Sequence, residues 1–243
     1  QLVAENCCLN RTAYLIYIDA MGRPLSRPNV IGNKTEGALI VMAKQWGFEY
    51  ENLRQTMFNE ETDKVFSFNS AKKRSTTVVH LKNGRVRVYV KGAPEWVLAD
   101  CTNYLCPDGS IDIMTAAKKQ EIEEHLNVMA NNARRTLILA HKDFASASQL
   151  PSNWQDSPPD NSGLCCDCVV GIIDPLRDDV KDAVRMAQEA GVTVRMVTGD
   201  NLNTACAIAR QCGILTANGV ALEGPVFRNM TPSQVDAVLP QIG

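Results

Sequence analysis

Two short stretches combine residue types that could hold a phosphorylated ligand. Lys91 follows the β-rich run Arg85–Val90 and precedes Gly92. Lysine is a compact cation suited to phosphate or a purine edge, and glycine lacks a Cβ, so a flat ring could approach the backbone there. Phe68 precedes three consecutive cations at 72–74, which sets a base-stacking ring beside phosphate-seeking amines. Base stacking on an aromatic contributes about 1–3 kcal/mol. Taken singly, both patterns are more usually explained by solvated surface charge.

A third stretch, Thr198-Gly199-Asp200, follows the apolar run 192–197 and precedes a helical pattern. Ligands of open α/β sheets bind at such strand ends, where a hydroxyl, a glycine amide and a helix N-terminus suit a phosphate oxygen. The alternative is an ordinary strand-to-helix turn in which Thr or Asp caps the helix. From these three residues alone, the ordinary turn is the better interpretation.

The cysteines do not form a zinc-binding pattern. The chain has 9 Cys and 3 His, and Cys165-Cys166-Asp167-Cys168 contains one C-x-x-C. A zinc site would need a second such pair or a spaced pair of histidines. We therefore predict no metal site and interpret 165–173 as a buried strand, where free cysteine behaves as a small hydrophobe.

Bulk composition excludes several classes of protein. The chain has 243 residues, 45% of them hydrophobic, and a net charge of −2. It can bury a full core, and it lacks the basic field of a nucleic-acid binder. No apolar run approaches the roughly 18 residues of a membrane helix. The chain opens without Met or a signal-type region, so we expect a piece of a longer protein. We expect its thiols to be reduced, as in a cytosolic protein.

The first part of the chain mixes strands and helices joined by hairpins, which predicts an α+β fold with an antiparallel sheet flanked by helices. Asn83-Gly84 between two β-rich runs predicts a hairpin, and Pro94 predicts a helix start. Thr35 is the expected N-cap of a helix that ends at Gly47. The other expected elements are strands at 14–18, 64–70, 76–81, 136–144 and 165–173, helices at 51–60 and 115–132, and loops at 22–33 and 149–163.

The pattern changes after Asp174. A helix at 178–190, a strand at 192–197 and a helix from Leu202 to Gly213 follow one another through short turns. This αβα order predicts half of a doubly wound unit, which makes the second part a partial Rossmann-like α/β segment.

In this order and spacing, the motifs resemble those of the P-type ATPases, most closely the plasma-membrane-type calcium pumps. The set covers most of the chain and is specific as a whole, although each motif alone is weak. The matching stretches are Gly32–Leu39, Phe68–Ser70 with Lys72-Lys73, Lys91–Glu95, Arg135–Leu137, Asp174–Arg177 and Met196–Asn201.

The resemblance implies a nucleotide-binding domain at 1–171 and a partial phosphorylation domain, haloacid-dehalogenase-like, at 172–243. It implies that Phe68 stacks on adenine, Glu36 bonds the adenine amino group, and Lys91 lines the purine pocket with Gly92 giving clearance. The remaining implied roles are phosphate contact for Lys73 and Arg135, packing nearby for Leu137, a hinge at Asp174, Pro175 and Arg177, and phosphate handling by Thr198, Gly199 and Asp200.

The resemblance also implies ATP as ligand and a parent enzyme that transports calcium through an aspartyl-phosphate, with this chain at the cytosolic face of the plasma membrane or of an internal calcium-store membrane. The phosphorylated aspartate, the Mg²⁺ ligands, the transmembrane domain and a calmodulin-binding segment would lie outside this chain. The fragment would therefore bind ATP without turning it over. Departures from the family pattern are Ser70 in place of an arginine, Lys72 in place of an arginine, and Gly37 in place of a cysteine.

Two alternatives stay open at this point. One is the same domain of a pump for another cation or a lipid, which the missing membrane helices would distinguish. The other is a haloacid-dehalogenase-like phosphatase module, which the Thr198-Gly199-Asp200 corner suggests and the lack of a D-x-D nucleophile opposes.

Overall fold

The computed structural model describes residues 1–9, 11–173 and 176–242. The chain divides into two compact units, and each is described by itself below. The first unit contains residues 1–120 and 137–170, and the second contains 121–136 and 171–243. Among the residues described, no helix combines the length and apolar character needed to cross a bilayer.

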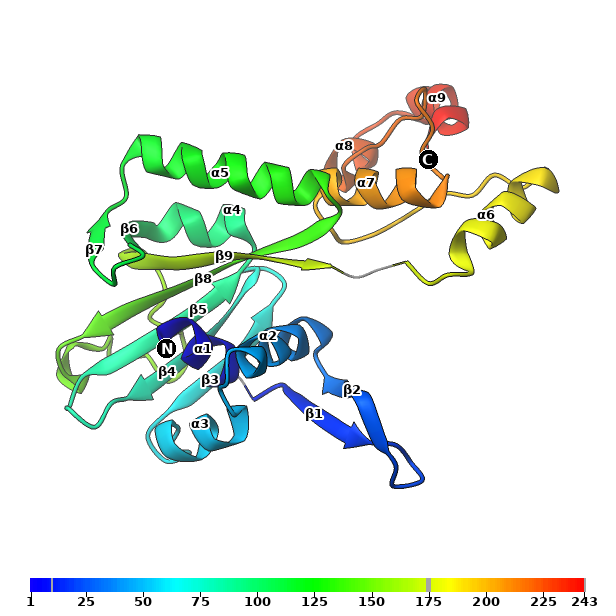
Figure 1. The fold of residues 1–243 in the computed structure, drawn as a ribbon. Helices are drawn as coiled ribbons and strands as arrows, with labels where there is room; N and C mark the ends of the chain where they lie inside the picture. Colours follow the sequence, from blue (N-terminus) through cyan, green and yellow to red (C-terminus); the bar gives the residue numbers. More distant parts are fainter. Residues whose placement is uncertain (10, 174–175, 243) are drawn as a thin grey trace. The chain divides into compact units, whose positions relative to one another are not determined.

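The first unit is built on a seven-stranded sheet in the order β3-β4-β5-β8-β9-β6-β7 (Figure 1). The pairs β3/β4, β4/β5, β5/β8 and β6/β7 are antiparallel, whereas β6 and β9 are parallel. The expected α+β class with a mostly antiparallel sheet is confirmed. The strands are β3 (Lys64–Asn69), β4 (Arg74–His80), β5 (Val86–Gly92), β6 (Cys101–Leu105), β7 (Ile111–Ile113), β8 (Arg134–Phe144) and β9 (Leu164–Ile173).

The strands β4 and β5 form the hairpin that the sequence predicts, and both are interior strands of the sheet. Gly84 has φ 80°, a left-handed conformation that glycine adopts without strain, and this turns the chain back on itself. The two strands then pair from Arg74 opposite Gly92 to His80 opposite Val86. Val78, Val88 and Val90 are fully buried. This hairpin therefore forms the hydrophobic centre of the first unit.

Three helices pack against one another beside the sheet: α1 (Leu2–Leu9), α2 (Lys34–Gln45) and α3 (Tyr50–Met57) (Figure 1). The amide of Asn6 donates to the carbonyls of Val90 and Ala140, both at 3.1 Å, so α1 is fastened to β5 and β8. The first unit also contains α4 (Pro94–Val97), which begins at the expected proline, and short 3₁₀ turns at Leu98–Asp100 and Ala147–Gln149. The helix α5 (Ala116–Asn131) begins in the first unit and belongs to the second from Glu121 onward.

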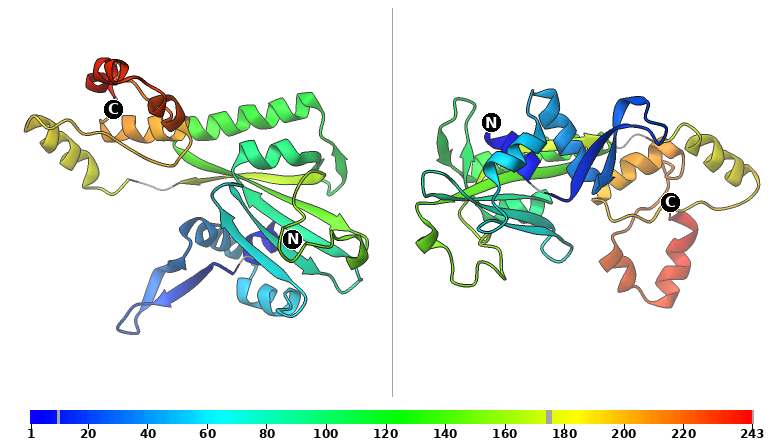
Figure 2. Two further views of the ribbon diagram at one scale, coloured as in Figure 1. Left: turned by 180° about the vertical axis from the view of Figure 1, so that it is seen from behind. Right: turned by 90° about the horizontal axis from the view of Figure 1, so that it is seen from below.

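Two expectations for the stretch before α2 are wrong. The predicted loop at 22–33 contains β2 (Pro24–Gly32), which pairs with β1 (Ala13–Ile18) in a separate two-stranded ribbon beside α2 (Figures 1 and 2). Each strand of such a ribbon has a free edge, which accommodates prolines that lack an N–H donor. The N-cap of α2 is Asn33 rather than Thr35, because the Asn33 side chain accepts from the Glu36 amide at 3.1 Å.

The second unit contains the two predicted helices, α6 (Val180–Glu189) and α7 (Leu202–Cys212), the latter ending at Gly213 with φ 79°. The predicted strand at 192–197 is not observed. A strand requires a pairing partner, and the only bridge within 176–242 joins Val220 to Ile242. The Rossmann-like arrangement is therefore not seen in this part of the structure. Two short helices, α8 (Gly224–Arg228) and α9 (Pro232–Val238), and a 3₁₀ turn at Leu239–Gln241 follow.

Candidate functional site

A buried ion pair lies at the carboxyl end of β5. The Lys91 ammonium is 2.6 Å from Oε2 of Glu36 and donates to the backbone carbonyl of Asn6 at 2.9 Å. Lys91 is only 5% exposed and Glu36 only 6%. Glu36 stands in the first turn of α2, where the Asn33 cap fixes the start of the helix, and its Oε1 accepts from the hydroxyl of Ser75 at 3.4 Å. Lys91 thus joins α1, α2 and β5, and the surface-charge interpretation of this lysine is wrong.

The turn between β3 and β4 lies beside this strand end. Asn69 holds the turn by accepting from the amides of Ala71 and Lys72 at 2.8 and 3.1 Å. Lys73 adopts a left-handed conformation (φ 51°), and its carbonyl accepts from the Ala93 amide at 2.9 Å. The turn is therefore tied to the residue that follows β5.

Phe68, Lys73 and Lys91 consequently lie at the same end of the neighbouring strands β3, β4 and β5. Phe68 lies at the end of β3, which pairs with β4 through Asn69 and Arg74. The Phe68 ring is 51% exposed, and Lys73 is also exposed. An accessible ring and amine next to a buried ion pair form a suitable surface for an aromatic ligand that carries phosphate.

Gly92 has a different role from the expected one. A Cβ built on Gly92 would lie 2.5 Å from the Lys73 carbonyl oxygen and 2.8 Å from Cα of Arg74. On that side, the space gained by the missing side chain is filled by the neighbouring strand rather than left for a ring. The glycine permits close approach of β4 and β5, which sets the position of the Lys73 turn.

Arg74, the third cation of the basic run at 72–74, has a structural role that the sequence pattern did not indicate. Arg74 is 7% exposed, and its guanidinium donates to Oδ2 of Asp100 at 2.7 Å and to the carbonyl of Asp160 at 3.0 Å. Asp160 is fully buried and accepts from the Thr76 hydroxyl at 2.6 Å. The loop at 149–163, expected from composition to lie on the surface, is therefore anchored to β4. No short-range pattern distinguishes Arg74 from Lys72 and Lys73.

Leu137 and Arg135 fall in different units. Leu137 is half-buried and precedes Ile138, which pairs with Gly92. Leu137 therefore lies in β8 beside the end of β5 that carries Lys91. Arg135 belongs to the second unit, where its guanidinium approaches Oδ1 of Asp200 at 2.7 Å.

The predicted phosphate-handling residues form a turn that is closed by its own side chains. The Thr198 hydroxyl is 3.0 Å from Oδ2 of Asp200, and the Asp200 amide donates back to that hydroxyl at 3.1 Å. The N-cap of α7 is Asn201, whose side chain accepts from Asn203. A Cβ at Gly199 would meet nothing within 4 Å. The backbone at Gly199 is therefore open to a ligand.

The hinge expectation is only partly described by the structure. Arg177 has a side chain that is 86% exposed and lies 4.0 Å from Asp179. Asp174 and Pro175 lie outside the described residues.

One hollow of the first unit lies apart from these residues. It has a volume of about 580 Å³ and is lined by residues that include Arg11, Phe58, Asp63, Lys64 and Trp154. Phe68, Lys73 and Lys91 do not line it. The hollow is lined by charged side chains of both signs, whereas the strand ends combine an exposed ring, an exposed amine and a buried ion pair, and we take the strand ends as the candidate site.

Comparison with known proteins identifies the family. Residues 1–179 match the family described as P-type ATPase, cytoplasmic domain N. The chain belongs to this family. All of the residues that converge at the ends of β3, β4 and β5 lie within the matched range.

Similar proteins are calcium-transporting ATPases. The chain is 43% identical over 213 residues to calcium-transporting ATPase PAT1 of Dictyostelium discoideum, a match that covers 87% of this chain and 18% of the relative. It is 39% identical over 221 residues to calcium-transporting ATPase 2, plasma membrane-type, of Arabidopsis thaliana (89% and 21%). It is 40% identical over 203 residues to plasma membrane calcium-transporting ATPase 1 of Homo sapiens (82% and 17%). The chain thus spans about a fifth of the length of these relatives.

Proposed function

We propose that the first unit binds ATP and serves as the nucleotide-binding part of a calcium-transporting P-type ATPase. The observation that carries this proposal is the exposed Phe68 ring at the same strand ends as the buried Glu36–Lys91 pair. These residues lie within the range that matches the family. The names of the relatives support calcium as the transported ion.

Each residue of the site then has a role that follows from its surroundings. Phe68 stacks on adenine, because its ring is free on the solvent side. Glu36 accepts from the adenine amino group, and Lys91 fixes the orientation of the Glu36 carboxylate. Lys73, exposed on its left-handed turn, contacts the phosphates, and Leu137 lies beside the ring.

Turnover requires groups beyond those of the ATP site. Phosphoryl transfer depends on positioning and on charge stabilisation, which Mg²⁺ and a nucleophile provide. We infer that Thr198, Gly199 and Asp200 hold the transferred phosphate in the complete pump, and that Asp174, Pro175 and Arg177 form a hinge between domains 1–171 and 172–243. This chain alone binds ATP and leaves it intact. In the cell it lies at the cytosolic face of the membrane, with the other pump domains as its partners.

The test is a titration of the isolated chain with ATP, monitored by backbone and side-chain NMR. Perturbed signals should cluster at Phe68, Lys73 and Lys91, and inorganic phosphate alone should not perturb Phe68. If the perturbations cluster instead around Trp154 and the hollow beside it, the proposed site is wrong.

A further inference from the structure

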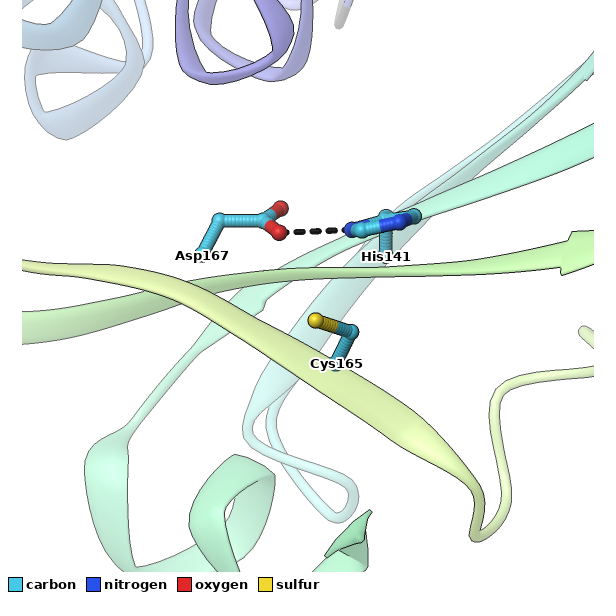
Figure 3. A group of neighbouring side chains, drawn as sticks. All are labelled: His141, Cys165 and Asp167. Carbon is cyan, nitrogen blue, oxygen red and sulfur yellow. Dashed lines mark hydrogen bonds and ion pairs between the residues drawn. The ribbon is translucent and has the colours of Figure 1, made fainter. Parts of the chain in front are cut away.

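A group of buried side chains with mixed chemistry lies in the sheet of the first unit, apart from the residues proposed for ATP. His141 comes from β8, and Cys165 and Asp167 come from the neighbouring strand β9 (Figure 3). One ligand atom from each of the three lies within 4.8 Å of the other two. Cys165 and Asp167 are two residues apart, so they share one face of the strand. The adjacent strands therefore present an imidazole, a thiol and a carboxylate to a common point.

Only one oxygen of the Asp167 carboxylate has a hydrogen-bond partner among the described residues. Its Oδ1 is 2.5 Å from Nδ1 of His141, and Figure 3 shows the carboxylate facing the ring. Its Oδ2 has no hydrogen-bond partner among the residues that the structure describes, although the Asp167 side chain is 0% exposed. A buried carboxylate oxygen without a donor is unfavourable. The unpartnered oxygen points to a cationic ligand in this group.

Arg87, a cation whose charge acts on Asp167, is already paired with other carboxylates. Arg87 donates to both oxygens of Asp143 at 2.6 and 2.7 Å. Asp143 also accepts from Arg85 at 2.9 Å. Arg87 also lies 3.9 Å from Oε2 of Glu5, so Asp143 and Glu5 together balance the two arginines, and the charge of Asp167 is left to a different partner.

The donor set selects the kind of cation. Nitrogen, sulfur and oxygen ligands together suit Zn²⁺ or a similar borderline-soft divalent ion, and an open fourth position is filled by water. A neutral imidazole, a thiolate and a carboxylate carry two negative charges, so the bound ion would leave the buried site neutral. Tetrahedral zinc requires ligand atoms about 3.4 Å apart. The His141–Asp167 pair must open from 2.5 Å, and Cys165 must approach, by side-chain rotations of about an ångström.

We propose that His141, Cys165 and Asp167 form a site for a divalent cation of the zinc class that bridges β8 and β9. The sequence contains no zinc motif because the histidine and the Cys-x-Asp pair are brought together only by strand pairing. The inference does not depend on ATP binding, and its test does not involve nucleotide.

The test uses Co²⁺ added to the unaltered, reduced and metal-free chain. One equivalent should produce tetrahedral visible bands and a sulfur-to-cobalt charge-transfer band, and Zn²⁺ should abolish both. Cys165→Ser should remove the charge-transfer band. Cys206→Ser, which alters a partly exposed thiol on α7, should leave it unchanged. A band that is absent at one equivalent, or that disappears with Cys206→Ser and survives Cys165→Ser, would overturn the proposal.

A second measurement avoids variants that fail to fold. Zn²⁺ added to the unaltered chain should shift the imidazole NMR signals of His141 and leave those of His125 in place. It should also raise the midpoint of thermal unfolding, because the ion binds the folded state in preference to the unfolded chain. Equal shifts at both histidines, or no change in the midpoint, would show nonspecific binding only and would contradict the site.

Discussion

The Lys91 ammonium lies 2.6 Å from Oε2 of Glu36, with both side chains removed from solvent. This ion pair joins the end of β5 to the first turn of α2. A buried pair contributes little over an apolar pair of the same volume, but the loss of one partner leaves an uncompensated charge. The same two residues are therefore expected to affect both stability and ligand binding.

Lys91→Met should lower the free energy of unfolding by about 3–5 kcal/mol, because Glu36 is left buried without its cation. The double variant Lys91→Met/Glu36→Gln should recover most of that loss, because it also removes the buried, unpaired charge of Glu36. Urea denaturation of the wild type, both single variants and the double variant completes the cycle. Additive effects of the two substitutions would show that the ion pair is not formed in solution.

Phe68→Ala should weaken ATP binding by about 1–3 kcal/mol through loss of stacking. Its unfolding free energy should hardly change, because the ring is 51% exposed. Trp46→Ala is a matched control: Trp46 is a 53% exposed aromatic at the other end of α2 from Glu36. Isothermal calorimetry gives the affinities. Equal losses of affinity for both variants would argue against stacking at Phe68.

Gly92→Ala should destabilise the first unit by about 1–3 kcal/mol, because the added methyl overlaps the Lys73 carbonyl and Arg74. ATP affinity should fall as well, since relief of the overlap moves the Lys73 turn. Gly224→Ala, whose Cβ would meet nothing within 4 Å, is the control and should be nearly neutral. A thermal midpoint for Gly92→Ala equal to that of the wild type would disprove the close strand approach.

Asp160→Ala should free the loop at 149–163. The substitution leaves the buried Thr76 hydroxyl without its acceptor, at a cost of about 1–3 kcal/mol. Limited proteolysis should cleave the loop faster in this variant. Asp156→Ala, at an exposed position of the same loop, should match the wild type. Identical cleavage rates for the two variants would mean that Asp160 does not anchor the loop.

The thiols of α1 should react slowly. Burial raises the pKa of Cys7 to about 12 and that of Cys8 to about 11. Because the thiolate is the nucleophile, the thiolate fraction of Cys7 near pH 8 is about a thousandfold below that of a free cysteine, and it rises with pH up to the raised pKa. Iodoacetamide labelling with mass spectrometry should modify the partly exposed Cys206 before Cys7 and Cys8. Labelling of Cys7 at the rate of Cys206 in the native chain would contradict this burial.

The elements that the sequence predicts well are those with local determinants. Asn83-Gly84 defines the β4–β5 hairpin and Pro94 begins α4, because each acts through its own backbone preferences. The strand β2 was missed because its prolines favour a loop, and only pairing with β1 makes it a strand. The expected strand at 192–197 fails for the converse reason, since an apolar run alone does not supply a partner.

The residues of the candidate site are proposed from the order of the motifs, whereas the geometry at these residues was not predictable. Motif order identified Phe68, Glu36 and Lys91 together, but the sequence could not show that Lys91 is buried against Glu36, because the two residues meet only through packing of α2 on the sheet. Likewise, a run of three cations does not reveal that its last member, Arg74, points inward to Asp100. Such distinctions depend on strand alternation and on loops that are distant in sequence.

The parallel pairing of β6 with β9 has a kinetic consequence. Leu164 aligns with Cys101 across a stretch that includes α5 and β8, whereas β3, β4 and β5 succeed one another through short turns. Long-range ladders form more slowly than hairpins, because much more chain must first be ordered. We therefore expect the hairpins of β3, β4 and β5 to form before the β6–β9 ladder, and the edge of β9 to be accessible to other molecules until that ladder has formed.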